Sequence, residues 1–322
     1  MVAALVQFGV SALVIIGAGV FLTKSADRLA EETGLGKVIV GSILLAGATS
    51  LPELMVDINA IWLDQPDLAV GDLLGSSLLN LLILAVVDTA FRHPRRAFLS
   101  EFAQHAGNAV LSINLTALVG VGILSQLYLS IFGVGLFIWF VVGVYFVGLS
   151  LNFRLPAKDG GGRLKGRILN RSMIEFVASA GVILVAAPYL VRSADQVARL
   201  SGLGHTFIGT TLVALATSLP ELVTTIAAFR IGAPDLALGN IFGSNTFNMI
   251  LFFPLDALYP GALLQSVRPA HALTAFCVVA VSSVAVMGQI SSKREKVRLW
   301  EPSSPLIVLI VIGSLYLLYR VR

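Results

Sequence analysis

The sequence predicts an all-α membrane protein of ten transmembrane helices, arranged as two inverted five-helix repeats. Three observations support this fold class: the composition, the spacing of apolar stretches, and an internal repeat. Of the 322 residues, 57% are hydrophobic and only 12% are charged, and the mean hydropathy is +0.89. Soluble domains carry about 25% charged residues, so the composition excludes an ordinary soluble protein.

Apolar stretches long enough to cross the hydrocarbon core, about 20 residues in a helix, recur along the whole chain. We count ten, at roughly 2–22, 37–62, 67–88, 103–126, 128–151, 172–191, 204–229, 235–258, 270–290 and 303–320. The first cation, Lys24, follows the first stretch and does not precede it. We therefore interpret that stretch as a retained helix and not as a signal peptide.

The Lys and Arg residues are distributed unevenly between the two sides that ten spans define. The loops after the first, third, fifth, seventh and ninth spans hold 17 of the 22, and the other side holds five. Positive residues stay in the cytoplasm, so both termini are expected outside. The compact chain suits a prokaryotic inner membrane. The expected partners are the lipid bilayer and the transported ions, and nucleic acid is not expected. The sequence does not indicate an oligomeric state.

An internal repeat appears when the chain is shifted against itself by 168 residues. Residues 25–88 then match residues 193–256 at 28 of 64 positions, without a gap. The two copies begin an odd number of spans apart, so they enter the membrane from opposite faces. Such inverted repeats are typical of secondary transporters, with the binding site near the membrane midplane.

The repeat divides the chain into two halves. The first half is 1–151, with its most similar segment at about 36–88, and the second is 172–322, with the matching segment at about 204–256. Residues 152–171 join them, and their glycines and cations predict a flexible cytoplasmic linker.

The phrase Thr-Ser-Leu-Pro-Glu occurs in both copies, at 49–53 and at 217–221. Proline inside a helix deletes one backbone hydrogen bond and crowds the carbonyl four residues earlier. A glutamate in the hydrocarbon region is costly unless it faces a polar cavity or a partner. Each copy is therefore expected to break a membrane helix beside Glu53 or Glu221, which would make an ion site from freed carbonyls and an acid.

Further polar side chains fall on consistent helix faces around these glutamates. Thr49 and Thr217 lie four residues before them, and the following spans carry Ser76, Ser77, Asn80, Ser244, Asn245 and Asn248. All of these groups offer oxygen, the ligand atom that Na⁺ and Ca²⁺ prefer, and no His/Cys cluster suggests zinc or copper. The sequence thus predicts a hard-cation site and no resident cofactor.

At these residues the sequence resembles the calcium/cation antiporter superfamily, specifically the prokaryotic sodium/calcium exchangers. The resemblance covers nearly the whole chain. It is carried by the two Thr-Ser-Leu-Pro-Glu phrases and by the later phrase Gly239-Asn240-Ile241-Phe242-Gly243-Ser244-Asn245.

The resemblance implies that Glu53 and Glu221 bind Ca²⁺ between them. It implies that oxygens of Thr49, Ser50, Thr217 and Ser218 complete this site, and that sodium sites use the carbonyls of Ala46 and Ala214 with Ser76 and Ser244. Asn80 and Asn248 would lie at the centre. The first and sixth spans, 2–22 and 172–191, would slide across this core to switch access.

The first copy departs from the family pattern, with Asp72 and Ser77 where Asn is usual. Position 248, an aspartate in some relatives, is Asn here. Two site carboxylates neutralise one Ca²⁺ or two Na⁺, and a third Na⁺ would leave an uncompensated charge. The sodium stoichiometry is open at this point, and Asp57 or Asp72 could supply the missing charge.

The sequence therefore predicts a secondary-active antiporter that exchanges Na⁺ for Ca²⁺ by alternating access. The alternative is a proton-coupled Ca²⁺ or Mn²⁺ exchanger on the same scaffold, because two protons neutralise two glutamates equally well. An enzyme is not expected, since the sequence carries neither His-Glu-x-x-His nor Gly-x-Ser-x-Gly. A passive cation channel is a more remote alternative that flux without counter-ion dependence would reveal.

Overall fold

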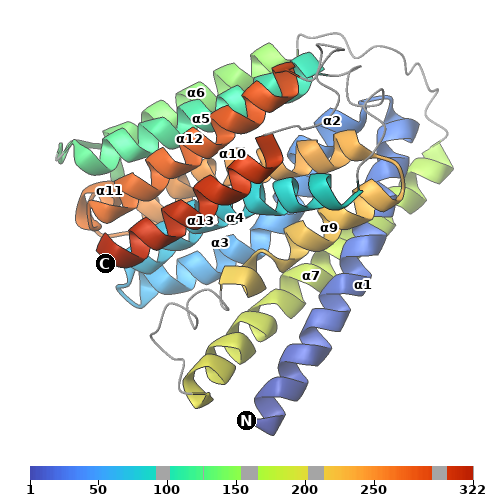
Figure 1. The fold of residues 1–322 in the computed structure, drawn as a ribbon, viewed down its shortest axis with the longest axis horizontal. Helices are drawn as coiled ribbons and strands as arrows, with labels where there is room; N and C mark the ends of the chain where they lie inside the picture. Colours follow the sequence, from blue (N-terminus) through green and yellow to red (C-terminus); the bar gives the residue numbers. More distant parts are fainter. Residues whose placement is uncertain (92–101, 126, 154–165, 202–213, 292–302, 322) are drawn as a thin grey trace. The chain divides into compact units, whose positions relative to one another are not determined.

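The computed structural model describes residues 1–91, 102–125, 127–153, 166–201, 214–291 and 303–321. Within these ranges the chain is helical apart from one short hairpin and the connecting turns (Figure 1). Seven helical stretches there are long and apolar enough to cross a membrane: 2–33, 37–62, 66–90, 105–124, 171–200, 234–258 and 270–288. Two more apolar helices, at 136–152 and 304–318, are shorter. The expected span 204–229 lies partly outside the described residues.

The chain divides into two compact units, and each takes segments from both halves of the sequence repeat. The first unit comprises Met1–Met55 and Ala157–Ile241, and the second Val56–Pro156 and Phe242–Arg322. The first unit contains α1 (Val2–Thr33), α2 (Lys37–Ile39), the π-helical turn η1 (Val40–Leu45), α7 (Gly166–Leu200) and α9 (Leu219–Arg230). It also holds the first parts of α3 (Ala46–Trp62) and α10 (Pro234–Leu258).

The helices α1 and α7 run side by side and form the most extensive helix pair of the first unit (Figure 1). Their contact contains Ile15, Ala187, Leu190 and Ala194, which are buried together with Ala216, the residue before the second motif copy. Small residues at such a contact let two backbones approach closely, which is how helices associate in lipid.

The outer faces of α1 and α7 carry large apolar side chains. Leu13 and Phe21 are 69% and 65% exposed, and Ile174 and Val185 are 67% and 65% exposed. Continuous exposed apolar surface of this kind is rare on soluble proteins and is what a lipid-facing helix requires.

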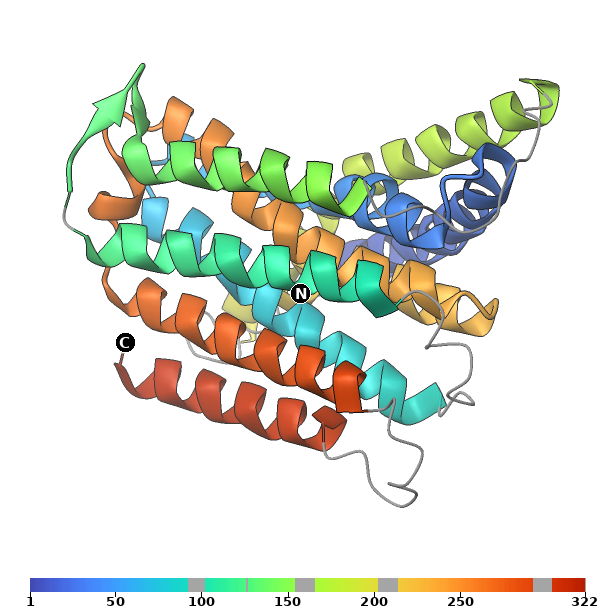
Figure 2. The ribbon, with the colours of Figure 1, turned by 90° about the horizontal axis from the view of Figure 1, so that it is seen from above.

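The second unit contains α4 (Pro66–Phe91), α5 (Phe102–Leu124), α6 (Leu136–Phe153), α11 (Leu263–Ser266), α12 (Ala270–Ser291) and α13 (Ser303–Val321). Figure 2 shows α6, α5, α12 and α13 as successive rows, and each helix packs on the next. α4 packs on both α12 and α13. The strands β1 (Ser130–Ile131) and β2 (Val134–Gly135) pair antiparallel and join α5 to α6.

The carboxylate of Asp256, at the end of α10, connects strand β2 and the start of α11 in the second unit. Its Oδ2 accepts a hydrogen bond from the backbone N–H of Gly135 at 2.6 Å, and its Oδ1 accepts one from Leu263 at 2.7 Å. The side chain is 1% exposed. Asp88, its match in the sequence repeat, accepts a hydrogen bond from the Ser304 hydroxyl at the start of α13. Each of the matched aspartates thus accepts hydrogen bonds from elements of the second unit outside its own helix.

Candidate functional site

The residues predicted for the ion site fall in both compact units, and those of the two motif copies lie in the same one. The first unit holds Ala46, Thr49, Ser50, Glu53, Ala214, Thr217, Ser218 and Glu221, and the second holds Ser76, Asn80, Ser244 and Asn248. All except Ala214 are buried, and Ala214 is half-buried.

The first motif copy lies within α3, and the helix continues through Pro52. The expected break beside this proline is therefore wrong for the first copy. The irregularity lies upstream instead, in the π-helical turn η1, where the N–H of Ala46 bonds to the carbonyls of Gly41 and Ile43. Proline is tolerated inside a membrane helix where side chains and neighbouring helices satisfy the freed backbone groups. π-Helical turns commonly mark functional positions.

The second motif copy does interrupt its helix. Residues 214–217 are helical, Ser218 leaves the helix with φ −85° and ψ 7°, and α9 begins at Leu219. Pro220 then lies in the first turn of α9, where a missing N–H costs no hydrogen bond. The same five-residue phrase therefore adopts two backbone conformations. Pro52 lies in a helix interior, and Pro220 lies in the first turn of a helix.

The threonine of each motif copy makes the same local contact. The hydroxyl of Thr49 donates to the carbonyl of Ala46 at 3.2 Å, and that of Thr217 donates to the carbonyl of Ala214 at 2.8 Å. The Ala214 carbonyl also accepts the N–H of Ser218 at 3.1 Å. These are the two carbonyls that the resemblance assigns to sodium, and each lies beside a hydroxyl oxygen of the motif.

The glutamates Glu53 and Glu221 are both fully buried, with no exposed side-chain surface. A carboxylate removed from water in a membrane protein is strongly disfavoured unless cations, protons or hydrogen bonds compensate it. Glu221 lies in the first turn of α9, where the helix N-terminus favours a negative charge.

A chain of hydrogen bonds connects the two motif copies inside the first unit. The hydroxyl of Thr49 lies 3.4 Å from Oδ1 of Asn240, and Nδ2 of Asn240 donates to the hydroxyl of Thr224 at 3.0 Å. The Thr224 hydroxyl lies 2.8 Å from the carbonyl of Pro220 and 3.1 Å from that of Glu221. Sequence reasoning did not place Asn240 and Thr224 in the site. The Gly-Asn phrase of the family pattern could have indicated Asn240. Nothing in the repeat indicates Thr224, because the matching residue of the first copy is Val56.

Two glycines allow this chain of hydrogen bonds to form. A β-carbon on Gly41 would lie 2.7 Å from the carbonyl oxygen of Leu236, and one on Gly239 would lie 2.9 Å from that of Val38. Contacts that short do not occur in real structures. The backbones of η1 and α10 therefore approach each other in a way that only glycine permits, and the residue after Gly239 is Asn240.

In the second unit, the two repeats meet at a pair of asparagines. Nδ2 of Asn80 donates to Oδ1 of Asn245 at 3.0 Å, and Nδ2 of Asn245 donates to the backbone carbonyl of Ser77 at 3.0 Å. Both side chains are fully buried. Within the described residues, Oδ1 of Asn80 accepts no hydrogen bond, which leaves a buried oxygen available to a cation.

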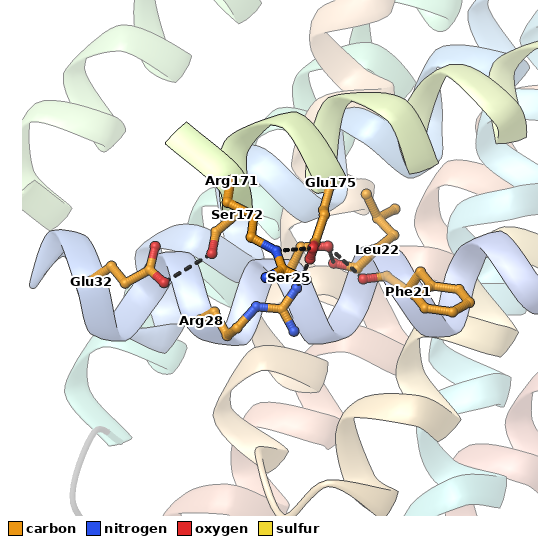
Figure 3. A network of polar contacts seen from close by, with 8 residues as sticks. All are labelled: Phe21, Leu22, Ser25, Arg28, Glu32, Arg171, Ser172 and Glu175. Carbon is orange, nitrogen blue, oxygen red and sulfur yellow. Dashed lines mark hydrogen bonds and ion pairs between the residues drawn. The ribbon is translucent and has the colours of Figure 1, made fainter. Parts of the chain in front are cut away.

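A charged cluster joins the ends of α1 and α7 (Figure 3). Arg28 of α1 forms an ion pair with Glu175 of α7, and Arg171 reaches the same carboxylate at 2.9 Å. The hydroxyl of Ser172 donates to Glu32 at 2.9 Å. These contacts connect α1 to α7, the two helices that contain the expected mobile spans 2–22 and 172–191.

Comparison with known proteins identifies the family. A family model described as sodium/calcium exchanger protein matches residues 3–153 and 171–319. The chain belongs to the sodium/calcium exchanger family. It is a prokaryotic-type member of the calcium/cation antiporter superfamily, as the sequence predicted, and this family is one of transporters.

Two relatives are 30% identical to this chain over most of its length. The inner membrane protein YrbG of Escherichia coli strain K12 is 30% identical over 272 residues, which covers 79% of this chain and 81% of YrbG. The sodium/calcium exchanger MaX1 of Methanosarcina acetivorans is 30% identical over 275 residues, which covers 74% of this chain and 78% of MaX1.

A solved structure shares the fold. The sodium-calcium exchanger NCX_Mj, soaked with 100 mM Na⁺ and 10 mM Sr²⁺, aligns with a TM-score of 0.76 at 19% identity, and the alignment covers 98% of this chain and 99% of NCX_Mj. The protein is thus a multi-pass integral membrane protein of the cation antiporter class, with the NCX_Mj fold.

Proposed function

We propose that the protein exchanges Na⁺ for Ca²⁺ across the membrane by alternating access. The observation that carries the proposal is the pair of fully buried glutamates, Glu53 and Glu221, in two copies of one motif within one compact unit. Cations stabilise buried carboxylates, and one Ca²⁺ or a set of monovalent cations would compensate these two glutamates in turn. Competition for this compensation couples the two fluxes.

The proposed Ca²⁺ site consists of Glu53 and Glu221 with oxygens of Thr49, Ser50, Thr217 and Ser218. The proposed sodium positions use the carbonyls of Ala46 and Ala214 with Ser76 and Ser244, and Asn80 and Asn248 lie between them. The hydrogen bonds from Thr49 and Thr217 to these carbonyls support this assignment, because they align hydroxyl and carbonyl oxygens at each helix irregularity. The open Oδ1 of Asn80 supports it as well.

We further propose the topology that the sequence predicts. Ten helices form two inverted repeats, with halves 1–151 and 172–322 and a cytoplasmic linker at 152–171, and both termini lie outside an inner membrane. Segments 2–22 and 172–191 move together as the access-switching pair. The contact between α1 and α7 and their charged cluster support joint movement, since the contact contains small residues and the cluster holds one end.

The test is uptake of radioactive Ca²⁺ into proteoliposomes loaded with Na⁺ and diluted into Na⁺-free buffer, with a pH-gradient arm alongside. We expect uptake that requires internal Na⁺ and disappears in both Glu53→Gln and Glu221→Gln. Exchange that survives both substitutions would refute the site. Uptake driven only by the pH gradient would transfer the protein to the proton-coupled class, and uptake without any counter-ion would indicate a channel.

A further inference from the structure

The hairpin between α5 and α6 exposes a large aromatic side chain at its tip. The side chain of Phe132 is 94% exposed, the highest value among the large hydrophobic residues that the structure describes. Tyr128, Leu129 and Ile131 of the same connection are exposed as well. Figure 2 shows the two strands as arrows at the ends of α5 and α6. A single exposed apolar residue is ordinary, whereas a group of four in one short connection indicates an interaction surface.

The backbone at Phe132 gives a second, independent observation. Phe132 has φ 53° and Gly133 has φ 78°, and the flanking residues Ile131 and Val134 pair across the turn. Positive φ at both central residues is the pattern of a type I′ turn, which favours Asn, Asp or Gly at the first of them. A bulky side chain in this conformation is rare, because its β-carbon crowds the backbone. The turn therefore carries an aromatic ring at a backbone cost that Asn or Gly would avoid.

The turn between α3 and α4 shows how the chain fills the same backbone conformation elsewhere. Asp64 in that turn also has φ 53°, and it is exposed. Asp tolerates positive φ and its carboxylate favours water. Both turns connect consecutive apolar helices, so the difference between Asp64 and Phe132 lies in the side chain and not in the backbone. This difference indicates that the two turns have different surroundings.

The surroundings of the hairpin are indicated by its lack of charge. Residues 102–153, which include α5, the hairpin and α6, contain no Asp, Glu, Lys or Arg. Exposed apolar side chains continue from the hairpin into α6, at Phe140, Phe146 and Val147. These helical residues face lipid, because α6 is an apolar helix of a membrane protein. An uncharged connection rich in aromatic residues fits the boundary between lipid headgroups and acyl chains, where such rings accumulate.

The base of the hairpin is held to the second unit by specific contacts. The N–H of Gly135 donates to Oδ2 of Asp256 at 2.6 Å, and the indole N–H of Trp139 donates to the Ile131 carbonyl at 3.0 Å. The ring of Trp139 also packs edge-on against Phe253 of α10, with ring centroids 5.4 Å apart. These contacts fix the direction of the hairpin relative to the end of α10.

From these observations we propose that the hairpin 128–135 is a membrane-interface anchor, with Phe132 inserted among the phospholipids of the bilayer that contains α5 and α6. Transfer of the ring out of water offsets the unfavourable backbone conformation at the tip. Asp256 connects this anchor to α10, so the insertion of Phe132 sets the depth of that helix end. The inference goes beyond the proposed exchange activity and does not depend on which cations are transported.

The test measures the depth of the hairpin with a nitroxide spin label on Ser130→Cys, in a protein whose single native cysteine carries the change Cys277→Ala. Ser130 is exposed and close to the tip, so Phe132 stays in place. In vesicles of phosphatidylcholine and phosphatidylglycerol, accessibility of the label to O₂, which concentrates among acyl chains, is compared with accessibility to a water-soluble nickel chelate. We expect an O₂:nickel ratio several-fold higher than that of the same label on Asp64→Cys. Equal ratios at the two positions would overturn the proposal.

A second pair of variants tests the ring itself. Phe132→Asn suits positive φ and keeps the turn, but it removes the aromatic ring. With a native circular dichroism spectrum, this variant should show an O₂:nickel ratio at Ser130 close to the Asp64 value, whereas Phe132→Trp should keep the native ratio. An unchanged ratio in Phe132→Asn would refute the role of the ring. Spin–spin broadening at Ser130 that disappears on dilution with unlabelled protein would show that a second copy covers the tip, and would overturn the assignment to lipid.

Discussion

Gly41 and Gly239 come from different copies of the sequence repeat, yet a β-carbon on either would lie 3.2 Å from the α-carbon of the other. Gly41 lies in the π-helical turn that precedes the first motif copy, and Gly239 is followed by Asn240, which bonds to Thr224. The geometry of the proposed ion site therefore depends on two residues that carry no functional group.

Substitution of Gly239 by Ala should destabilise the protein severely. The new methyl group would meet backbone atoms of Val38, Gly41 and Ser42, which cannot rotate away. Overpacking of this kind costs about 1–3 kcal/mol and here displaces Asn240 as well. Thermal unfolding of the detergent-purified protein measures the effect. Gly181→Ala on α7, where nothing lies within 4 Å of the new atom, is the control and should unfold at the native temperature or above it.

Replacing Asn240 by Leu should weaken cation binding while the protein still folds. The substitution keeps the volume and removes the amide that links Thr49 to Thr224. Loss of buried hydrogen bonds costs about 1–3 kcal/mol, so the Ca²⁺ concentration for half-maximal uptake should rise by roughly tenfold. Asn114→Leu is the control, because the exposed Asn114 amide bonds to the Val110 carbonyl of its own helix. Equal affinities in both variants would contradict a role for the Asn240 bridge.

Asp256→Ala should reduce stability without changing ion selectivity. It leaves the N–H groups of Gly135 and Leu263 without their acceptor, at about 1–3 kcal/mol for each buried donor. Asp256→Asn retains one acceptor oxygen and should lie between Ala and the native residue. Melting temperature, read together with the ratio of Ca²⁺ to Mn²⁺ uptake, checks this expectation. A shift in the ratio of Ca²⁺ to Mn²⁺ uptake would contradict this prediction, because it would show that Asp256 influences ion selectivity.

Breaking the ion pair between α1 and α7 should slow transport by a few fold with little change in stability. Glu175→Gln removes the negative charge that pairs with both Arg28 and Arg171, yet the pairs are partly exposed and such pairs contribute little to folding. The expected effect is on turnover, since the cluster attaches the two helices proposed to move together. Initial rates of Ca²⁺ uptake at saturating Na⁺ measure it.

The control for this prediction is Arg199→Gln, which removes an ion pair with Asp195 that lies wholly within α7. The turnover of this variant should equal that of the native protein. If both variants slow transport equally, the effect belongs to surface charge and not to the attachment of α1 to α7.

Much of the fold was readable from the sequence because membrane helices leave strong local signals. Apolar length located some described spans within a few residues, as at 234–258 against the predicted 235–258. The stretches predicted at 2–22 and 172–191 belong to longer helices, which the structure describes at 2–33 and 171–200. The matched motifs identified the family, and the buried state of Glu53 and Glu221 followed from their place in apolar runs. The number of spans and the inverted arrangement stay predictions.

The sequence alone determined which residue types recur at which spacing, since hydrophobic length and repeated motifs are local properties of the chain. The tertiary structure decided how identical motifs differ. Pro52 stays inside a helix that widened upstream at η1, whereas Pro220 opens a new helix after Ser218. It also brought Asn240 to Thr49 and Thr224, and left the hydroxyl of Thr225 open among the described residues. Those outcomes depend on the close approach of separate backbones at Gly41 and Gly239, because hydrogen-bond partners distant in sequence are fixed only when the helices pack.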